Sequence, residues 1–265
     1  MKNYPITLTI AGSDTGGGAG VQADLKTFSS LSTFGTTVFT CLTAQNPDGV
    51  SAIHEIPASF IKQQLSAVLD YFPVNAAKTG MLFSKSIIMT VGEILAKHKE
   101  IKVVVDPVMI ATSGAKLLQD DAIESMKSTL IPLATLLTPN LDEASHLLGE
   151  HIASYDELEK AAKNLYDLFH VPILLKGGHL KNAIDAVDVL FDGKSIYEFK
   201  KKYLQNKNTH GTGCTYSSAI TAYLARGMSL VEAVGHAKEY IHSALENSIQ
   251  TGKVLHMNHF PDEIV

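Results

Sequence analysis

Glycine, threonine and cysteine are concentrated in one short segment, Thr209–Thr215, which reads Thr-His-Gly-Thr-Gly-Cys-Thr. A run of helical period, Tyr216–Arg226, follows it directly. Small residues at the start of a helix let successive backbone N–H groups point at an anion, and the helix dipole adds partial positive charge. Negative charge that develops on a transferring phosphoryl group would be stabilised there. Gly211, Thr212 and Gly213 are therefore a candidate anion hole.

Cys214 lies at the start of the same predicted helix. A helix N-terminus favours the thiolate, so we expect the pKa of this thiol to be lowered. A thiolate in this position would suit the removal of a proton from a substrate hydroxyl. The segment also fits a glycine turn before a core helix with an inert buried cysteine, and it does not by itself decide between the two interpretations.

A second glycine-rich segment, Gly12–Gly20, follows the first predicted strand. Its spacing is not Gly-x-Gly-x-x-Gly, and no Gly-Lys-Ser/Thr follows, so it matches neither a dinucleotide-binding fingerprint nor a Walker loop. The segment is a weak signal for the close approach of the backbone to a flat ligand.

Asp24 falls on the apolar face of the helix predicted after these glycines, the face that carries Val21, Leu25 and Phe28. An inward-facing carboxylate needs a partner, and a ligand hydroxyl or ring N–H would serve. The alternative is a carboxylate in a first helical turn, favoured by the helix dipole, which suits a solvent-facing position better.

Polar residues follow three further predicted strands. Asn140 and Glu143 form an Asn-x-x-Glu pair that could hold magnesium through water, although taken alone an ordinary helix start explains them better. Asp106, which ends a strand before Pro107, is similarly ambiguous. Lys176 ends a strand where a nucleotide phosphate could be met. No histidine stands at metal-ligand spacing with a cysteine or a second histidine, which argues against a zinc site.

Short β-branched runs alternate with stretches of helical period along the whole chain. This alternation predicts a three-layer α/β architecture with a mostly parallel central sheet and helices on both faces. Ligands bind beyond the carboxyl ends of the strands in such sheets, where most of the residues above fall. The predicted strands are Ile6–Ala11, Thr36–Thr43, Val74–Lys78, Lys102–Asp106, Leu133–Thr138, Val171–Lys176 and Val187–Phe191.

Asp192-Gly193 predicts a two-residue hairpin late in the chain, and with it an antiparallel edge to the sheet. No repeat, low-complexity tract or linker rich in Pro or Ser occurs, so residues 1–265 are expected to form one domain.

The net charge of −5 and the absence of a basic block longer than Lys200–Lys202 argue against nucleic-acid or anionic-membrane partners. No apolar stretch of 18 residues occurs, and the N-terminal apolar run is too short for a signal peptide, so the protein is expected to be cytoplasmic.

These segments together resemble the ribokinase superfamily, and more closely the hydroxymethylpyrimidine/phosphomethylpyrimidine kinases of thiamine biosynthesis. The resemblance runs roughly from Ile6 to Leu245. It is carried by Leu8–Asp14, Gly17–Phe28, Leu42–Asn46, Lys78–Leu82, Val105–Met109, Thr138–Asn140, Lys176–His179 and Thr209–Thr215.

The resemblance implies a ribokinase-like fold, with Thr36–Pro57 as a small partial lid, and a homodimer. It implies transfer of the γ-phosphoryl group of ATP, with Mg²⁺, to the hydroxymethyl oxygen of an aminopyrimidine, and a second transfer to the resulting monophosphate. The implied pyrimidine-binding residues are Gly12, Asp24, Gln45, Met81 and Val108, with Asp24 and Gln45 as hydrogen-bonding groups. The implied anion hole and base are Gly211, Thr212, Gly213 and Cys214; the implied nucleotide and magnesium residues are Asp106, Asn140, Glu143, Lys176 and Thr209.

A pyridoxal or pyridoxine kinase on the same fold is the nearest alternative, because vitamin B6 also presents a hydroxymethyl group on a flat ring. Thr43–Asn46 and Met81 favour the pyrimidine. A non-catalytic pyrimidine or nucleotide sensor is a weaker alternative, since the Gly211–Gly213 segment and Glu143 are intact. A nicotinamide dehydrogenase is weaker still, and absence of NAD binding would exclude it.

Overall fold

The computed structural model describes residues 3–109, 118, 120–152, 154–178, 184–205 and 207–261, so that His179 lies outside the described residues. Among the helices in these ranges, none has both the length and the hydrophobicity to cross a membrane.

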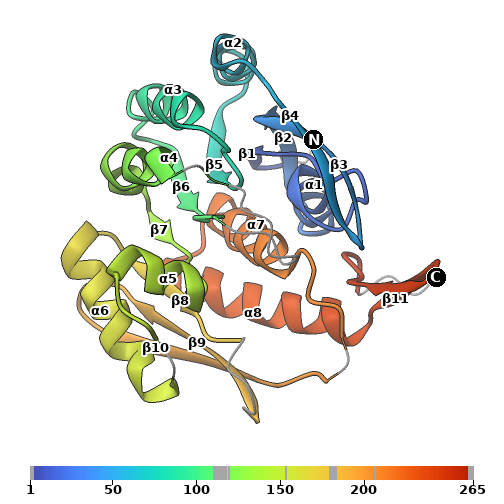
Figure 1. The fold of residues 1–265 in the computed structure, drawn as a ribbon, viewed down its shortest axis with the longest axis vertical. Helices are drawn as coiled ribbons and strands as arrows, with labels where there is room; N and C mark the ends of the chain where they lie inside the picture. Colours follow the sequence, from blue (N-terminus) through green and yellow to red (C-terminus); the bar gives the residue numbers. More distant parts are fainter. Residues whose placement is uncertain are drawn as a thin grey trace.

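An eight-stranded sheet forms the centre of the molecule, with the strand order β10-β9-β8-β7-β6-β5-β1-β2 (Figure 1). The six strands from β2 to β8 in this order pair in parallel, whereas β9 pairs antiparallel with both β8 and β10. The predicted parallel sheet with an antiparallel edge is therefore confirmed. The strands are β1 (Ile6–Ala11), β2 (Phe34–Phe39), β5 (Val74–Thr79), β6 (Lys102–Val105), β7 (Leu136–Leu137), β8 (Ile173–Lys176), β9 (Asp185–Phe191) and β10 (Ile196–Lys202).

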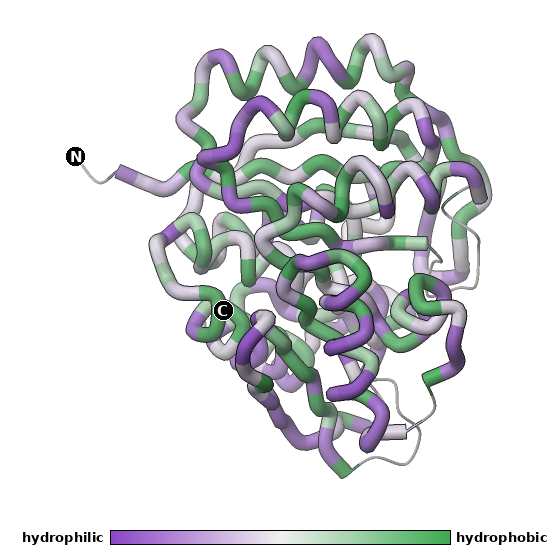
Figure 2. Tube along the Cα trace, turned by 90° about the vertical axis from the view of Figure 1, so that its left-hand side faces the viewer, coloured by the Kyte–Doolittle hydropathy of each residue, from purple (hydrophilic) through white to green (hydrophobic). Residues whose placement is uncertain are grey.

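Helices cover both faces of this sheet, as the strand composition predicts. Val103 and Val105 pack into one hydrophobic cluster, and Val104 between them packs into the other, since neighbouring side chains of a strand point to opposite faces. Figure 2 shows the complementary pattern along the helices, where hydrophilic and hydrophobic residues alternate. One face carries α1 (Gly20–Ser30), α7 (Thr212–Ala225) and α8 (Leu230–Glu246); the other carries α2 (Ala58–Leu69), α3 (Lys85–Leu95), α4 (Asp120–Ser125), α5 (Leu141–Leu148) and α6 (Leu158–Phe169).

The predicted strand Thr36–Thr43 is wrong in its extent, because the chain leaves the central sheet at Thr40. The Thr40 hydroxyl donates to the carbonyl of Met81 at 2.6 Å, and its backbone N–H donates to Ala11. Beyond it, β3 (Cys41–Asn46) and β4 (Gly49–Glu55) form a separate antiparallel hairpin beside β1 and β2 (Figure 1). This hairpin forms most of the segment predicted as a partial lid.

Two smaller differences concern strand length and the end of the chain. The predicted strand Leu133–Thr138 is reduced to β7, because Ile131–Leu133 forms a short 3-10 helix that contains Pro132. A second hairpin, β11 (Ile249–Thr251) and β12 (Val254–His256), was not predicted.

Candidate active site

A cavity of about 760 Å³ lies beyond the carboxyl ends of β1, β5, β6 and β8. It gathers residues that are far apart in the sequence, as the topology of a parallel sheet requires. Every residue predicted for the site lines it except Asp24. The lining includes Gly12, Gln45, Met81, Asp106, Val108, Asn140, Glu143, Lys176, Thr209, Gly211, Thr212, Gly213 and Cys214.

Gly211 packs the candidate anion hole, Gly211–Gly213, tightly against the first glycine-rich loop. It adopts φ +81°, and a Cβ there would lie 1.9 Å from the carbonyl oxygen of Gly18, so only glycine fits without displacement. Next to it, a Cβ at Gly213 would lie 3.6 Å from Lys176 Nζ and 3.9 Å from Asp106 Oδ2. The start of α7, where the first N–H groups lack partners within the helix, therefore faces a cation and a carboxylate.

Asp14 ties the two loops together and was not predicted as a site residue. Its carboxylate accepts hydrogen bonds from the backbone N–H groups of Gly16, Gly18 and Ala19, at 2.8, 3.1 and 2.8 Å. Its Oδ2 also lies 3.0 Å from His210 Nε2 in the anion-hole loop. Burial acts to raise the pKa of Asp14, but these hydrogen bonds hold it below its usual value.

Cys214 is half-buried, and the expected lowering of its pKa is wrong. Burial raises the pKa of the thiol to about 11, and the carboxylates of Asp24 and Asp106 act in the same direction. The cation of Lys78 opposes them, as does a hydrogen bond from the N–H of Gly20, the first residue of α1. The sulfur is therefore held by the starts of two helices, yet desolvation outweighs their effect.

Asp106, Lys176 and Glu143 form a charged group deep in the cavity. Lys176 Nζ lies 2.9 Å from Asp106 Oδ1, and Ser217 donates to Asp106 Oδ2 at 3.1 Å. Burial would raise the pKa of Asp106, but Lys176 and Lys78 hold it below its usual value. Burial raises the pKa of Glu143 to about 7, with Lys176 opposing the rise and Asp106 adding to it.

Asn140 and Glu143 also form the capping box of α5, with reciprocal hydrogen bonds of 2.8 Å. The helix-start interpretation of this pair is therefore confirmed, and both residues line the cavity as well.

Asp106 and Glu143 offer the hard oxygen donors that Mg²⁺ prefers. No group of three or more His, Cys, Asp or Glu side chains that could hold a metal occurs in the described part of the chain. Mg²⁺ keeps several waters and takes one or two carboxylates together with substrate phosphates, so a pair of carboxylates beside Lys176 fits this ion.

The inward orientation predicted for Asp24 is correct, but the groups that pair with its carboxylate are side chains of the protein and not those of a ligand. The side chain is fully buried, and its carboxylate accepts from Thr9 Oγ1, Ser218 Oγ and Lys78 Nζ at 2.6, 2.6 and 3.1 Å. It does not contribute to the cavity lining. The geometry gives no support to a direct hydrogen bond from Asp24 to a substrate.

Other residues that line the cavity, away from the Gly211–Gly213 segment, could not be identified from the sequence. Lys238 of α8 and Asp188 of β9 form a buried ion pair of 2.7 Å there, beside Tyr216. The N–H of Gly177 donates to the other carboxylate oxygen of Asp188 at 3.1 Å. Neither Asp188 nor Lys238 lies in a recognisable motif. A signal was available only in the charged residue Asp188, placed inside the apolar run of β9.

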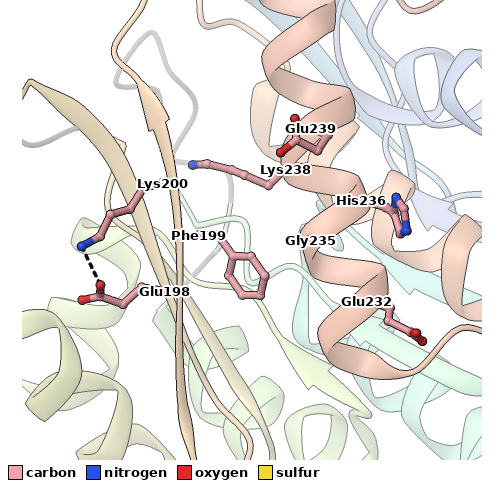
Figure 3. A pocket seen from close by; sticks show the side chains of 8 residues that line it. All are labelled: Glu198, Phe199, Lys200, Glu232, Gly235, His236, Lys238 and Glu239. Atoms are coloured by element: carbon pink, nitrogen blue, oxygen red, sulfur yellow. Dashed lines mark ion pairs between the residues drawn. The ribbon is translucent and has the colours of Figure 1, made fainter.

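A second hollow, of about 410 Å³, lies between β10 and α8 (Figure 3). Its carboxylates and lysines already have partners, two of which lie outside the hollow: Lys238 pairs with Asp188, and Glu239 pairs with Lys201. Glu198 pairs with Lys200 at 2.6 Å, and Glu232 caps the start of α8. Phe199 lies between these groups and faces Gly235 (Figure 3). A Cβ at Gly235 would be 3.4 Å from the Phe199 ring. The hollow presents no set of groups aimed at a shared ligand.

Known proteins match nearly the whole chain. Residues 14–259 match the phosphomethylpyrimidine kinase family. A bifunctional thiamine biosynthesis protein of Geobacter sulfurreducens is 48% identical over 93% of this chain, which spans only 50% of that protein. A hydroxymethylpyrimidine/phosphomethylpyrimidine kinase of Bacillus subtilis is 42% identical over 92% of this chain and 90% of its own length.

Among solved structures, the pyridoxal kinase of Staphylococcus aureus in complex with ADP superposes with a TM-score of 0.90 at 36% identity, covering 98% of this chain and 95% of that one. This similarity places the fold among the ribokinase-like vitamin kinases. Since the family match covers almost every described element, the chain belongs to the phosphomethylpyrimidine kinase family.

Proposed function

We propose that this protein uses ATP to phosphorylate the hydroxymethyl group of 4-amino-5-hydroxymethyl-2-methylpyrimidine, and then phosphorylates the monophosphate to the diphosphate, for thiamine biosynthesis. One observation carries the proposal: a single cavity joins Gly12, Gln45 and Met81 to the anion-hole segment Gly211–Gly213 and to Lys176. A flat ring at the first group would place its substituent beside the segment suited to phosphoryl transfer.

In the first step, the hydroxymethyl oxygen forms a bond to the γ-phosphorus while the bond to ADP breaks, and the hydroxyl proton leaves. Cys214 lies at the start of α7 and is the candidate acceptor of that proton. Because the pKa of its thiol is about 11 in the free protein, only a small fraction is thiolate near neutral pH. In the second step the nucleophile is a phosphate oxygen that is already anionic, so no base is needed.

Lys176 and the start of α7 would neutralise charge on the phosphates during transfer. Asp106 and Glu143 would hold Mg²⁺, which supplies further neutralisation of the nucleotide phosphates. We assign the nucleotide to the part of the cavity that contains Asn140, Lys176, Thr209 and the Asp188–Lys238 pair. We also expect a cytoplasmic homodimer.

A pyridoxal kinase is the second candidate, since the fold superposes closely on a kinase of that name. The two functions separate in one assay, in which the products formed from ATP and Mg²⁺ with each vitamin precursor are identified by mass spectrometry. Successive mono- and diphosphate of the pyrimidine is the expected result. Phosphorylation of pyridoxal alone would contradict the proposal and the pyrimidine-binding roles of Gln45 and Met81.

A further inference from the structure

Lys78 and Asp24 form an ion pair from which solvent is excluded. Both side chains are 0% exposed, and Lys78 Nζ lies 3.1 Å from Asp24 Oδ1. Thr9 and Ser218 donate the hydrogen bonds that complete the coordination of the carboxylate. The four residues come from β5, α1, β1 and α7, so the pair links the sheet to two helices on one of its faces.

Stability gives a poor account of this pair. Removing two charges from water costs several kcal/mol for each ion, and apolar residues of similar volume in their place are often neutral or stabilising. Thr9 and Ser218, which donate to Asp24, are themselves fully buried, so the pair lies inside the core between β1, β5 and α7. The position of the pair next to the cavity therefore explains the presence of two buried charges better than a contribution to the free energy of folding does.

The Lys78–Asp24 pair lies next to the part of the cavity where phosphoryl transfer is proposed. A Cβ at Gly80, which lines the cavity, would be 3.3 Å from Lys78 Nζ. Ser218 lies one turn after Cys214 in α7, and Asp24 lies one turn after Gly20 in α1. Because the N–H of Gly20 donates to the sulfur of Cys214, the pair fixes the two helix starts that hold the thiol.

Four charged groups from four elements act on this sulfur. Lys78 of β5 and Lys176 of β8 are cations, whereas Asp24 of α1 and Asp106, which follows β6, are anions. Lys78 is the strongest of the influences that favour the thiolate, and it opposes burial and both carboxylates. Its ammonium cannot move away to solvent, since Asp24 holds it in a site closed to water.

We propose that Lys78 and Asp24 are a positioning pair for Cys214: Asp24 fixes the buried ammonium, and the ammonium favours the thiolate that accepts the hydroxyl proton. This role rests on the proposed function, in which a proton must leave the substrate oxygen in the first transfer. The charge effect on the sulfur is nevertheless measurable without any kinase substrate.

The test is the rate of alkylation of Cys214 by iodoacetamide between pH 7.5 and 9.5. The rate is followed by mass spectrometry of the peptide that contains Cys214. Because only the thiolate reacts, the rate at each pH reports the thiolate fraction. We expect Lys78→Met to lower the rate about tenfold across this range, as loss of a nearby charge of opposite sign does. Thr9→Val, which removes a hydrogen bond to Asp24 but no charge, should stay within about twofold of the wild type.

Lys78→Met leaves a buried carboxylate without its cation, so it has to be compared with a variant that leaves no charge unpaired. The double variant Lys78→Met/Asp24→Asn should unfold at the wild-type temperature or above. Cys214 in the double variant should be alkylated more slowly than in the wild type, but the rate should fall by a smaller factor than in Lys78→Met. The first phosphorylation should be slower than in the wild type, and the rate of the second phosphorylation should be retained. Alkylation profiles of folded variants that superpose on the wild type would overturn the proposal. An inactive wild type would contradict the proposed function alone, because the alkylation rates need no substrate.

Discussion

The cavity and the hollow between β10 and α8 are both lined by charged side chains, but they hold those charges differently. In the cavity, the Lys176–Asp106 pair is 12% and 2% exposed, and Glu143 has its pKa raised to about 7. Figure 3 marks the Lys200–Glu198 ion pair of the hollow. Its two side chains are 50% and 31% exposed. Water screens the second pair and leaves the first strong. A cluster of charges therefore suggests a site only where the fold removes it from solvent and aims it at a shared space.

The largest expected effect is at Gly211, and it would test whether the cavity depends on close contact between its loops. Gly211→Ala places a Cβ against the Gly18 carbonyl, so we expect kcat/KM for pyrimidine phosphorylation to fall by at least ~10²-fold, as for loss of an anion-hole donor. Gly227→Ala is the matched control. Its φ is +90° with no atom within 4 Å of the new Cβ, so it should lose about 1 kcal/mol of stability and little activity. Wild-type kcat/KM in folded Gly211→Ala would contradict the prediction.

Cys214→Ala is expected to have the next largest effect, confined to one of the two reactions. The first phosphorylation should slow by ~10²-fold and the second much less, because a phosphate monoester needs no base. Rates of both steps measured separately by product mass spectrometry check this. Equal losses in both steps would indicate that Cys214 shapes the anion hole and is not a base.

The pH dependence of the two steps sharpens the same distinction. The thiol pKa is about 11, so the thiolate fraction rises throughout the range between pH 7 and 9. The first phosphorylation should therefore accelerate by up to about tenfold per pH unit, whereas the second should not. Initial rates of each step in this range provide the measurement, and parallel profiles for the two steps would count against Cys214 as the base.

Asp14→Asn should have an intermediate effect, since it weakens the link between the two loops but adds no atom. We expect the free energy of unfolding to fall by about 1–3 kcal/mol, as is typical when a buried charged hydrogen-bond acceptor is weakened, and kcat/KM to fall about tenfold.

The pKa of Asp14 in the folded protein is lowered. Its contribution to stability is therefore present above the unfolded value of 3.8 and is lost as the pH falls below it. Thermal unfolding between pH 2 and 7 should show a smaller acid destabilisation in the variant than in the wild type.

The smallest effect is expected in the hollow. Glu198→Gln removes a surface ion pair with Lys200, which contributes about 0.2–1 kcal/mol, and kcat/KM should stay within about twofold of the wild type. Thermal unfolding and steady-state kinetics measure both quantities. A large loss of activity in this variant would break the distinction between the two regions.

The sequence predicted the parts of the site that depend on local pattern. The glycines of Gly211–Gly213 and the strand ends at Asp106 and Lys176 could be located because turn residues and hydrophobic periodicity act over short distances. The exit of the chain at Thr40 could not, since β-branched residues continue on both sides of it. The correct strand edge depends on contacts with Ala11 and Met81, which no local pattern contains.

Electrostatic properties were the least predictable. The thiol pKa of Cys214 was expected to fall because its helix position was known and its surroundings were not. Its value depends on burial and on Lys78, Asp24 and Asp106, which come from three other elements. The Asp188–Lys238 pair escaped prediction for the same reason: 50 residues separate its members, and neither stands in a motif.

The contact between Gly18 and Gly211 has a consequence for the synthesis of the chain. Asp14 and His210, which flank this contact, are 196 residues apart in the sequence. A growing polypeptide emerges from the ribosome from its N-terminus, and most of it is exposed before the second loop exists. Until then the first loop lacks the surface against which it packs. A nascent or truncated chain that ends before His210 would therefore contain Gly12, Gln45 and Met81 but lack the loop that lines the cavity with them, so that activity would appear only once the last helices had been translated.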